Sequence, residues 1–122
     1  MLTAVLNGAN EVDVQGTPDQ GDPDGSGEAN VRINPGQRKL CYALNWRDIG
    51  AVVAAHVHDA AAGTNGPIVI PLALDGRTGI STGCTTAERD LLVDIIKDPT
   101  GYYVNLHTGA FPTGAIRGQL AR

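Results

Sequence analysis

The chain has 122 residues, a formal net charge of −4 at pH 7 and 42% hydrophobic residues, few of them aromatic. This length suits a single domain, expected over 1–122, and the lack of a basic cluster excludes the usual nucleic-acid-binding classes and binding to an anionic membrane surface. No apolar run approaches the ~20 residues that cross a bilayer, so membrane insertion is not expected.

Short apolar segments separated by glycine and proline are typical of an all-β protein. The segments with strand character are, in chain order, 2–8, 28–34, 38–46, 51–59, 67–74, 102–108 and 114–122. One face of the third segment is apolar and consists of Leu40, Tyr42, Leu44 and Trp46. We therefore expect an antiparallel β-sandwich or β-barrel of seven to eight strands.

One segment has helical periodicity instead. In TTAERDLLVDIIKDP (85–99), leucine and isoleucine recur at helical intervals, and Pro99 ends the run. Thr85 and Glu88 have the spacing of a capping box. We expect one short helix over about 86–97, crossing from one sheet to the other.

The chain has two cysteines, Cys41 and Cys84, and neither lies in a CxxC motif. A single pair separated by a long loop indicates either a disulfide in an exported protein or two buried free thiols in a cytosolic core. The disulfide is favoured, because the segment STGCTT around Cys84 has the composition of a turn and not of a core strand.

All three histidines lie in two of the expected strands. His56 and His58 are one residue apart in AHVHD, and because alternate residues of a strand point the same way, both imidazoles project in one direction. His107 lies in NLHTG, on the same face as Tyr103 and Asn105. If the two strands are neighbours, three imidazoles converge into a site for a transition metal. The alternative is a set of polar or hydrogen-bonded histidines on a wet sheet face.

Imidazole ligation without thiolate favours copper, which also lies above zinc in the affinity order, and zinc is the alternative metal. Asp59 is a candidate fourth ligand or a hydrogen-bond partner of the ligands, and a solvated loop residue is the competing interpretation. Tyr103, Glu11 and Arg117 are further candidates to support the ligands. For Glu11 and Arg117 a structural ion pair is the preferred interpretation, and an anion-binding arginine the alternative.

The segment DPDGSGE places Asp22, Asp24 and Ser26 at the first three ligand positions of a calcium loop. The position of the bidentate acid is occupied by Ile33, so calcium is disfavoured against an ordinary turn.

No nucleophile, phosphate-loop or dinucleotide motif is present, and GISTG (79–83) has its serine one place late for a nucleophile elbow. The sequence therefore favours a role other than catalysis, with a copper redox activity as the alternative.

The segments LNGANEV, GDPDGSGEA, AAHVHDAAAGTNGPIVIPL and GYYVNLHTGAFPTGAIRGQL together resemble the CHRD domain, a module of chordin and of exported bacterial proteins. The resemblance runs from about Leu2 to Leu120. It departs from the family where EVPP is replaced by EVDV, and where Asp59 replaces a small residue.

The CHRD resemblance implies a secreted, extracellular or periplasmic β-sandwich, and an export signal that has been removed. It supports the disulfide between Cys41 and Cys84, and its matching histidines are His56, His58 and His107. The family name carries no settled chemistry. The HVH tripeptide is also similar to the copper-ligand strand of Cu/Zn superoxide dismutases, but only this tripeptide and the fold class match.

Two functional hypotheses follow. The first is an exported domain that binds one transition metal, copper favoured, through the three histidines. The second is a metal-free interaction or adhesion module, in which the histidines are structural and the loops 12–27 and 59–66 meet a partner. The sequence predicts neither the protein partner nor the oligomeric state.

Overall fold

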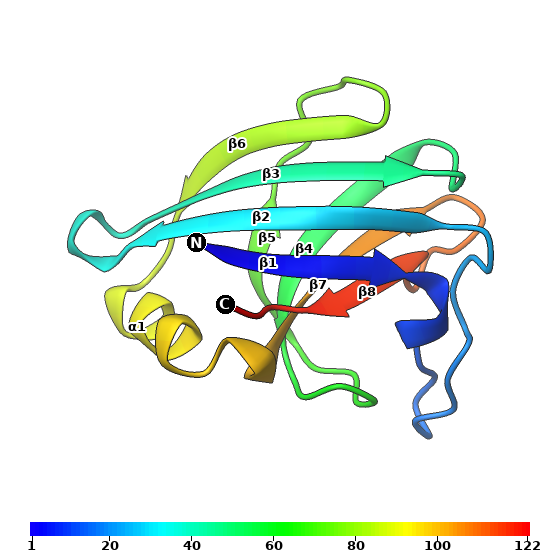
Figure 1. The fold of residues 1–122 in the computed structure, drawn as a ribbon, viewed down its shortest axis with the longest axis horizontal. Helices are drawn as coiled ribbons and strands as arrows, with labels where there is room; N and C mark the ends of the chain where they lie inside the picture. Colours follow the sequence, from blue (N-terminus) through cyan, green and yellow to red (C-terminus); the bar gives the residue numbers. More distant parts are fainter.

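The computed structural model describes residues 1–122 and contains eight strands in one antiparallel sheet, in the order β5-β4-β7-β8-β1-β2-β3-β6 (Figure 1). The strands are β1 Leu2–Asn7, β2 Ser26–Asn34, β3 Lys39–Arg47, β4 Val52–Asp59, β5 Ile68–Leu72, β6 Ile80–Thr86, β7 Tyr102–Thr108 and β8 Ile116–Gln119. The helices are α1 Arg89–Lys97 and three 3₁₀ turns, η1 Gly8–Asn10, η2 Pro35–Gln37 and η3 Pro99–Gly101. The predicted all-β fold with one short helix is confirmed.

The sheet curls into a nearly closed barrel, in which β1, β2, β3, β6 and β8 lie in front of β4, β5 and β7 (Figure 1). The two edge strands, β5 and β6, meet at a seam without a backbone ladder. Tyr42 on β3 reaches across this seam, and its hydroxyl donates a hydrogen bond to the Ala73 carbonyl at 2.8 Å. Gly83 on β6 allows this crossing, because a Cβ there would lie 2.7 Å from the Tyr42 hydroxyl oxygen.

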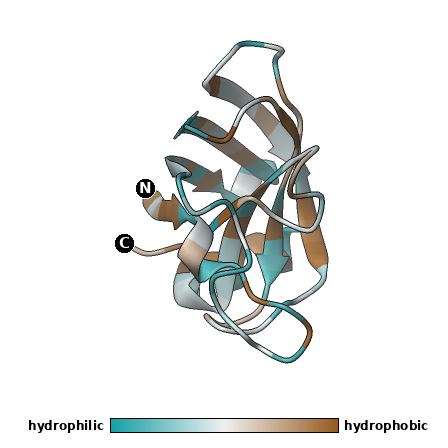
Figure 2. Cartoon of the chain, turned by 90° about the vertical axis from the view of Figure 1, so that its right-hand side faces the viewer, coloured by the Kyte–Doolittle hydropathy of each residue, from teal (hydrophilic) through white to brown (hydrophobic).

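Alternation along each strand separates the barrel interior from its outer surface, and hydrophobic and hydrophilic residues alternate visibly along the ribbons (Figure 2). The face of β3 that points into the barrel is the apolar face expected from the sequence, because all four of its residues are buried: Leu40, Tyr42, Leu44 and Trp46. They belong to one hydrophobic core of 22 buried residues. Burial of this continuous apolar core is the main stabilising contribution to the barrel.

Helix α1 connects β6 to β7 and packs against η2, at the turn between β2 and β3. Its apolar stripe enters the core, and Leu92 and Ile95 are 0% exposed. None of the helices in the chain is long and apolar enough to cross a membrane.

Strand β6 is the element that sequence reasoning missed, because its segment was interpreted as a turn. Its inward positions include Gly83 and the buried Ser81, and Gly83 lacks a side chain where the Tyr42 side chain fills the space. The capping box was also wrong: Thr85 lies within β6, and the helix N-cap is Glu88, without a side-chain cap hydrogen bond.

The predicted disulfide between Cys41 and Cys84 is present. The two cysteines are directly opposed on β3 and β6, with outward-facing side chains. The expected turn at Cys84 is therefore a strand, yet the pairing itself is confirmed. The disulfide attaches the edge strand β6 covalently to its single sheet neighbour.

Candidate metal centre

The strands that carry the histidines, β4 and β7, are antiparallel neighbours. Their register places His58 opposite Tyr103, and His56 opposite Asn105, on the outer face of the barrel. His107 is opposite Ala54, whose small side chain leaves room for the imidazole to lean toward His56. The sheet therefore brings together the three histidines that the sequence placed on one face of each strand.

The three rings gather closely. One ring nitrogen from each of His56, His58 and His107 lies within 4.8 Å of the others. The closest pair is His56 Nδ1 and His107 Nε2, at 3.1 Å, with ring centroids 4.9 Å apart. His58 stands edge-on to His56, with centroids at 5.6 Å and planes at 81°. Three nitrogens from two adjacent strands thus surround a common space.

Backbone carbonyls orient two of the rings. His58 Nδ1 is 2.9 Å from the Gly66 carbonyl oxygen, and His107 Nδ1 is 3.0 Å from the Pro112 carbonyl oxygen. A carbonyl can only accept, so each Nδ1 carries the proton and each Nε2 keeps its lone pair. The lone pair of His107 Nε2 faces His56 Nδ1 at 3.1 Å, whereas that of His58 Nε2 has no partner in the protein. Ligating histidines in metalloproteins are fixed in this way, with one nitrogen on a carbonyl and the other on the metal.

The Nε2 atom of His58 is the one buried side-chain nitrogen or oxygen without a hydrogen-bond partner in the structure. Its residue is 9% exposed, so water reaches the ring poorly. Because buried polar atoms are nearly always satisfied, this lone pair, beside two further imidazoles, needs a partner from outside the chain, either a water molecule or an ion.

The electrostatic environment keeps the rings neutral. Burial lowers the pKa of His56, His58 and His107 below the ordinary value near 6.5. The positive charge that His107 and His58 would carry lowers the pKa of His56 further. Neutral imidazoles at pH 7 have lone pairs available for a cation without first losing a proton.

A stack of three side chains supports His58. The Tyr103 ring lies parallel to the imidazole, with centroids 4.7 Å apart and planes at 4°, and its hydroxyl accepts a hydrogen bond from the Gly66 N–H at 3.2 Å. The Arg117 guanidinium carbon lies 3.4 Å from the centre of the Tyr103 ring. Tyr103 therefore contacts a proposed ligand directly, and Arg117 holds Tyr103 by a cation–π contact.

Arg117 is 1% exposed and does not form the expected ion pair with Glu11. Its guanidinium donates hydrogen bonds to the side-chain oxygen of Asn65 and to the carbonyls of Ala61 and Thr64, at 2.6–3.1 Å. The β4–β5 loop closes over the arginine and supplies these acceptors in place of a carboxylate.

Glu11 is 4% exposed, and Asn105 connects it to the strand pair that carries the histidines. Its carboxylate accepts a hydrogen bond from the amide of Asn105, the residue opposite His56. Burial raises its pKa to about 7, although the positive charge of Arg117 and the Asn105 hydrogen bond act in the opposite direction. Gly114 makes room for the carboxylate, since a Cβ there would lie 2.4 Å from it.

The remaining candidates lie apart from the cluster. Asp59 ends β4 with an exposed side chain, and the group of potential ligands near it contains histidines alone. In the candidate calcium loop, Asp22 Oδ1 accepts a hydrogen bond from the Asp24 N–H at 3.1 Å, as in an ordinary Asx turn. Ser26 is the exposed first residue of β2.

Sequence reasoning missed the loop residues that orient the cluster. Gly66 accepts from His58 and donates to Tyr103, and a Cβ at this position would lie 2.0 Å from the Asp59 carbonyl oxygen. Asn65 links Arg117 to the loop that follows η1, because its side-chain amide donates a hydrogen bond to the Val12 carbonyl at 2.9 Å. The dipeptide Asn65-Gly66 was visible as a turn signal, but nothing local indicated its partners.

Fold and site together define a disulfide-linked antiparallel β-barrel domain with a histidine cluster on its outer face. The family model that matches the chain is the CHRD domain, over residues 2–120, and the chain belongs to this family. Comparisons with curated proteins and with solved structures find no match. The CHRD resemblance noted in the sequence is thereby confirmed.

Proposed function

We propose that the chain is a single exported domain that binds one transition-metal ion, copper in preference to zinc, through His56, His58 and His107. The observation that carries this proposal is the buried, unpartnered Nε2 of His58, which lies in a group of three ring nitrogens. A buried polar atom without a partner destabilises a protein by about 1–3 kcal/mol, and a metal ion would relieve this penalty.

The spacing of the nitrogens is compatible with coordination. Three atoms within 4.8 Å of one another lie at most about 2.8 Å from a common centre. Metal–imidazole bonds are about 2.0–2.2 Å long, so small rotations of the rings would close the difference. The two Nδ1–carbonyl hydrogen bonds limit the loss of side-chain entropy in this step.

The donor set favours copper. Three neutral imidazoles without a thiolate or a carboxylate suit Cu(II), which also precedes zinc in the affinity order. Copper bound by three protein ligands would have a coordination position open to water or a small substrate, so we include a redox role in the proposal.

The compartment is inferred from the disulfide. The bond between Cys41 and Cys84 is of the kind that persists in oxidising environments, and CHRD domains occur in exported proteins. Both facts support an extracellular or periplasmic location.

Copper titration of tag-free protein, followed by calorimetry and electron paramagnetic resonance, tests the proposal. We expect one Cu(II) per chain with nitrogen hyperfine structure, and affinity at least about 100-fold weaker in His58→Ala. Asp90→Asn, on the exposed surface of α1, is the control and should bind as wild type.

Folded wild-type protein that binds neither copper nor zinc stoichiometrically would refute the metal site. Loss of stability in His56→Ala without any metal binding would instead support the metal-free module, with the 3.1 Å contact to His107 as scaffold.

A further inference from the structure

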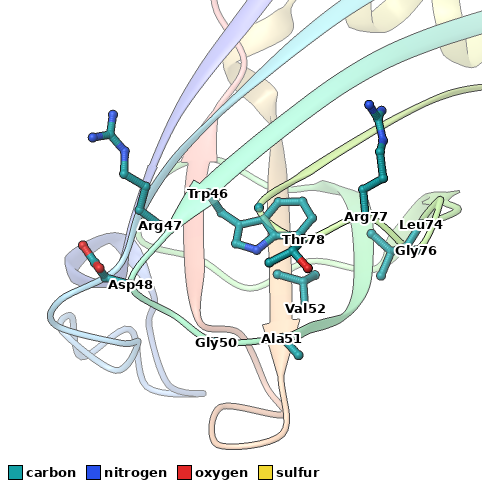
Figure 3. A pocket seen from close by; sticks show the side chains of 11 residues that line it. Trp46, Arg47, Asp48, Gly50, Ala51, Val52, Leu74, Gly76, Arg77 and Thr78 are labelled. Atoms are coloured by element: carbon teal, nitrogen blue, oxygen red, sulfur yellow. The ribbon is translucent and has the colours of Figure 1, made fainter.

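The two ends of the barrel are closed differently. Strand β3 starts beside η2, where α1 covers one end of the core with Leu92 and Ile95. At its other end, after Trp46, no α-helix covers the core, and the short 3₁₀ turn η1 follows β1 there. There a cavity of about 500 Å³ lies between the β3–β4 loop and the β5–β6 loop (Figure 3). This volume falls in the range of small-molecule sites, and barrel mouths are a common location for them.

The inner part of the cavity is apolar and contains one polar group, the indole N–H of Trp46. Trp46, 8% exposed, lines it together with Val52 and Leu74 (Figure 3). The indole N–H of Trp46 donates to no acceptor in the protein and is not among the buried unpartnered atoms, so it faces the open cavity. An apolar ring with an acceptor group would be complementary to this surface.

Glycines keep the mouth open. Gly50, Gly76 and Gly79 line it, and all three have positive φ angles of 76°, 85° and 77°. At Gly50 and Gly76 an added Cβ would meet no atom within 4 Å, so the space beside these two loop positions is open. Their backbone conformation, which other residues rarely adopt, maintains the opening.

Two arginines and one aspartate, Arg47, Arg77 and Asp48, line the rim of the cavity. The arginines rise on either side of the indole in Figure 3. Arg77 is held by Asp75 at 2.7 Å in the one ion pair of the structure, so Arg47 has no carboxylate partner. An exposed guanidinium without a partner is free to pair with an anionic group of a ligand.

We propose that this cavity binds a small aromatic carboxylate, with its ring against Trp46 and its carboxylate at the Arg47 side of the rim. The apolar interior selects the ring, and the Arg47 guanidinium, which has no ion-pair partner in the protein, selects the anion. The site is distinct from the histidine cluster, because none of the three histidines lines it.

Trp46 is the single tryptophan of the chain, so its fluorescence reports directly on this cavity. Titration with benzoate should shift its emission saturably, with a Kd on the order of 1 mM, and benzamide should bind at least about fivefold more weakly. Arg47→Gln should reduce benzoate affinity by a similar factor and leave benzamide unaffected.

A cavity-filling variant separates binding in the cavity from binding elsewhere. Ala51→Phe, at an exposed lining position, should abolish the benzoate response, whereas Val14→Phe, in an exposed loop away from the cavity, should retain it. The NMR signal of the Trp46 indole N–H provides a second readout. The proposal is overturned if neither this signal nor the emission of folded wild-type protein responds saturably to benzoate, or if Ala51→Phe binds benzoate like wild type.

Discussion

His58 shows how one side chain is prepared by residues distant in sequence. Its strand position sets the direction of the ring, the Gly66 carbonyl sets its tautomer, and the Tyr103 ring sets its plane. Each contact limits a different degree of freedom, and the one atom left without a partner is Nε2. A lone pair held in a defined direction before a metal arrives is the feature that makes an imidazole a strong ligand.

Gly66→Ala should weaken copper binding by about 10–100-fold and destabilise the fold by about 1–3 kcal/mol. The added Cβ would collide with the Asp59 carbonyl oxygen, 2.0 Å away, so the loop must move and release His58. Thermal unfolding and copper titration measure the two effects. Gly109→Ala is the matched control, because a Cβ there meets nothing within 4 Å. Unchanged copper affinity in Gly66→Ala would show that the loop does not orient the ligand.

Glu11 should make the apoprotein less stable as the pH rises from about 5 to 7. Its pKa in the folded state is raised to about 7 by burial, so the folded protein holds a proton that the unfolded chain releases near pH 4.5. This stabilisation is fully present below the pKa of the unfolded chain and amounts to up to about 3 kcal/mol. It is lost as the pH rises through the folded-state pKa of about 7.

Urea unfolding of wild type and Glu11→Gln between pH 5 and pH 8 isolates this contribution, because all other titrating groups are shared. The difference in unfolding free energy should move in favour of Glu11→Gln as the pH rises. Glu28→Gln, which replaces an exposed carboxylate on β2, should track wild type across the range. A pH-independent difference for Glu11→Gln would contradict the buried carboxyl.

Strand β6 is an element whose own residues do little to hold it in place. It lies at a sheet edge, pairs with β3 alone, and buries only Ser81. The disulfide compensates for this lack of apolar burial by joining it to β3. The seam contact from Tyr42 to Ala73 then holds the opposite side of the barrel close to β6.

Replacing both Cys41 and Cys84 by alanine should lower the unfolding free energy by about 4 kcal/mol in the chain-entropy model, given a sequence separation of 43. Urea unfolding with and without reductant measures this loss, and only wild type should respond to the reductant. Copper stoichiometry in the folded variant should remain one per chain, because β4 and β7 pair with neither β3 nor β6. Equal stability of wild type and variant would show that the disulfide does not constrain the fold.

The barrel as a whole separates two kinds of surface. Its interior is filled by the apolar core, while the outer face of β4, β7 and β8 carries a buried polar layer beneath the long loops. Arg117 and Glu11 are buried there, outside the apolar core. A barrel that is stable through its interior can keep a destabilising unpartnered atom such as His58 Nε2 on its outside.

Local pattern predicted much of this architecture. Period-two alternation identified seven of the strands, including the buried face of β3, and helical spacing identified α1. Strand β6 escaped because serine, glycine and threonine make up most of its sequence, and this composition is also that of a turn. Its strand conformation follows from pairing with β3 and from the space that Tyr42 occupies, neither of which is a local property.

For the site, the sequence alone determined that His56 and His58 share one side of a strand, because side-chain direction in a strand is a local consequence of backbone geometry. The meeting with His107 depended on β4 lying beside β7, a pairing across about 50 residues that alternation does not encode. The carbonyls of Gly66 and Pro112, which fix the tautomers of His58 and His107, depended on the paths of two loops. Convergence is a property of long-range packing, and that is why three histidines could be named as candidates from the sequence but assembled only in the folded barrel.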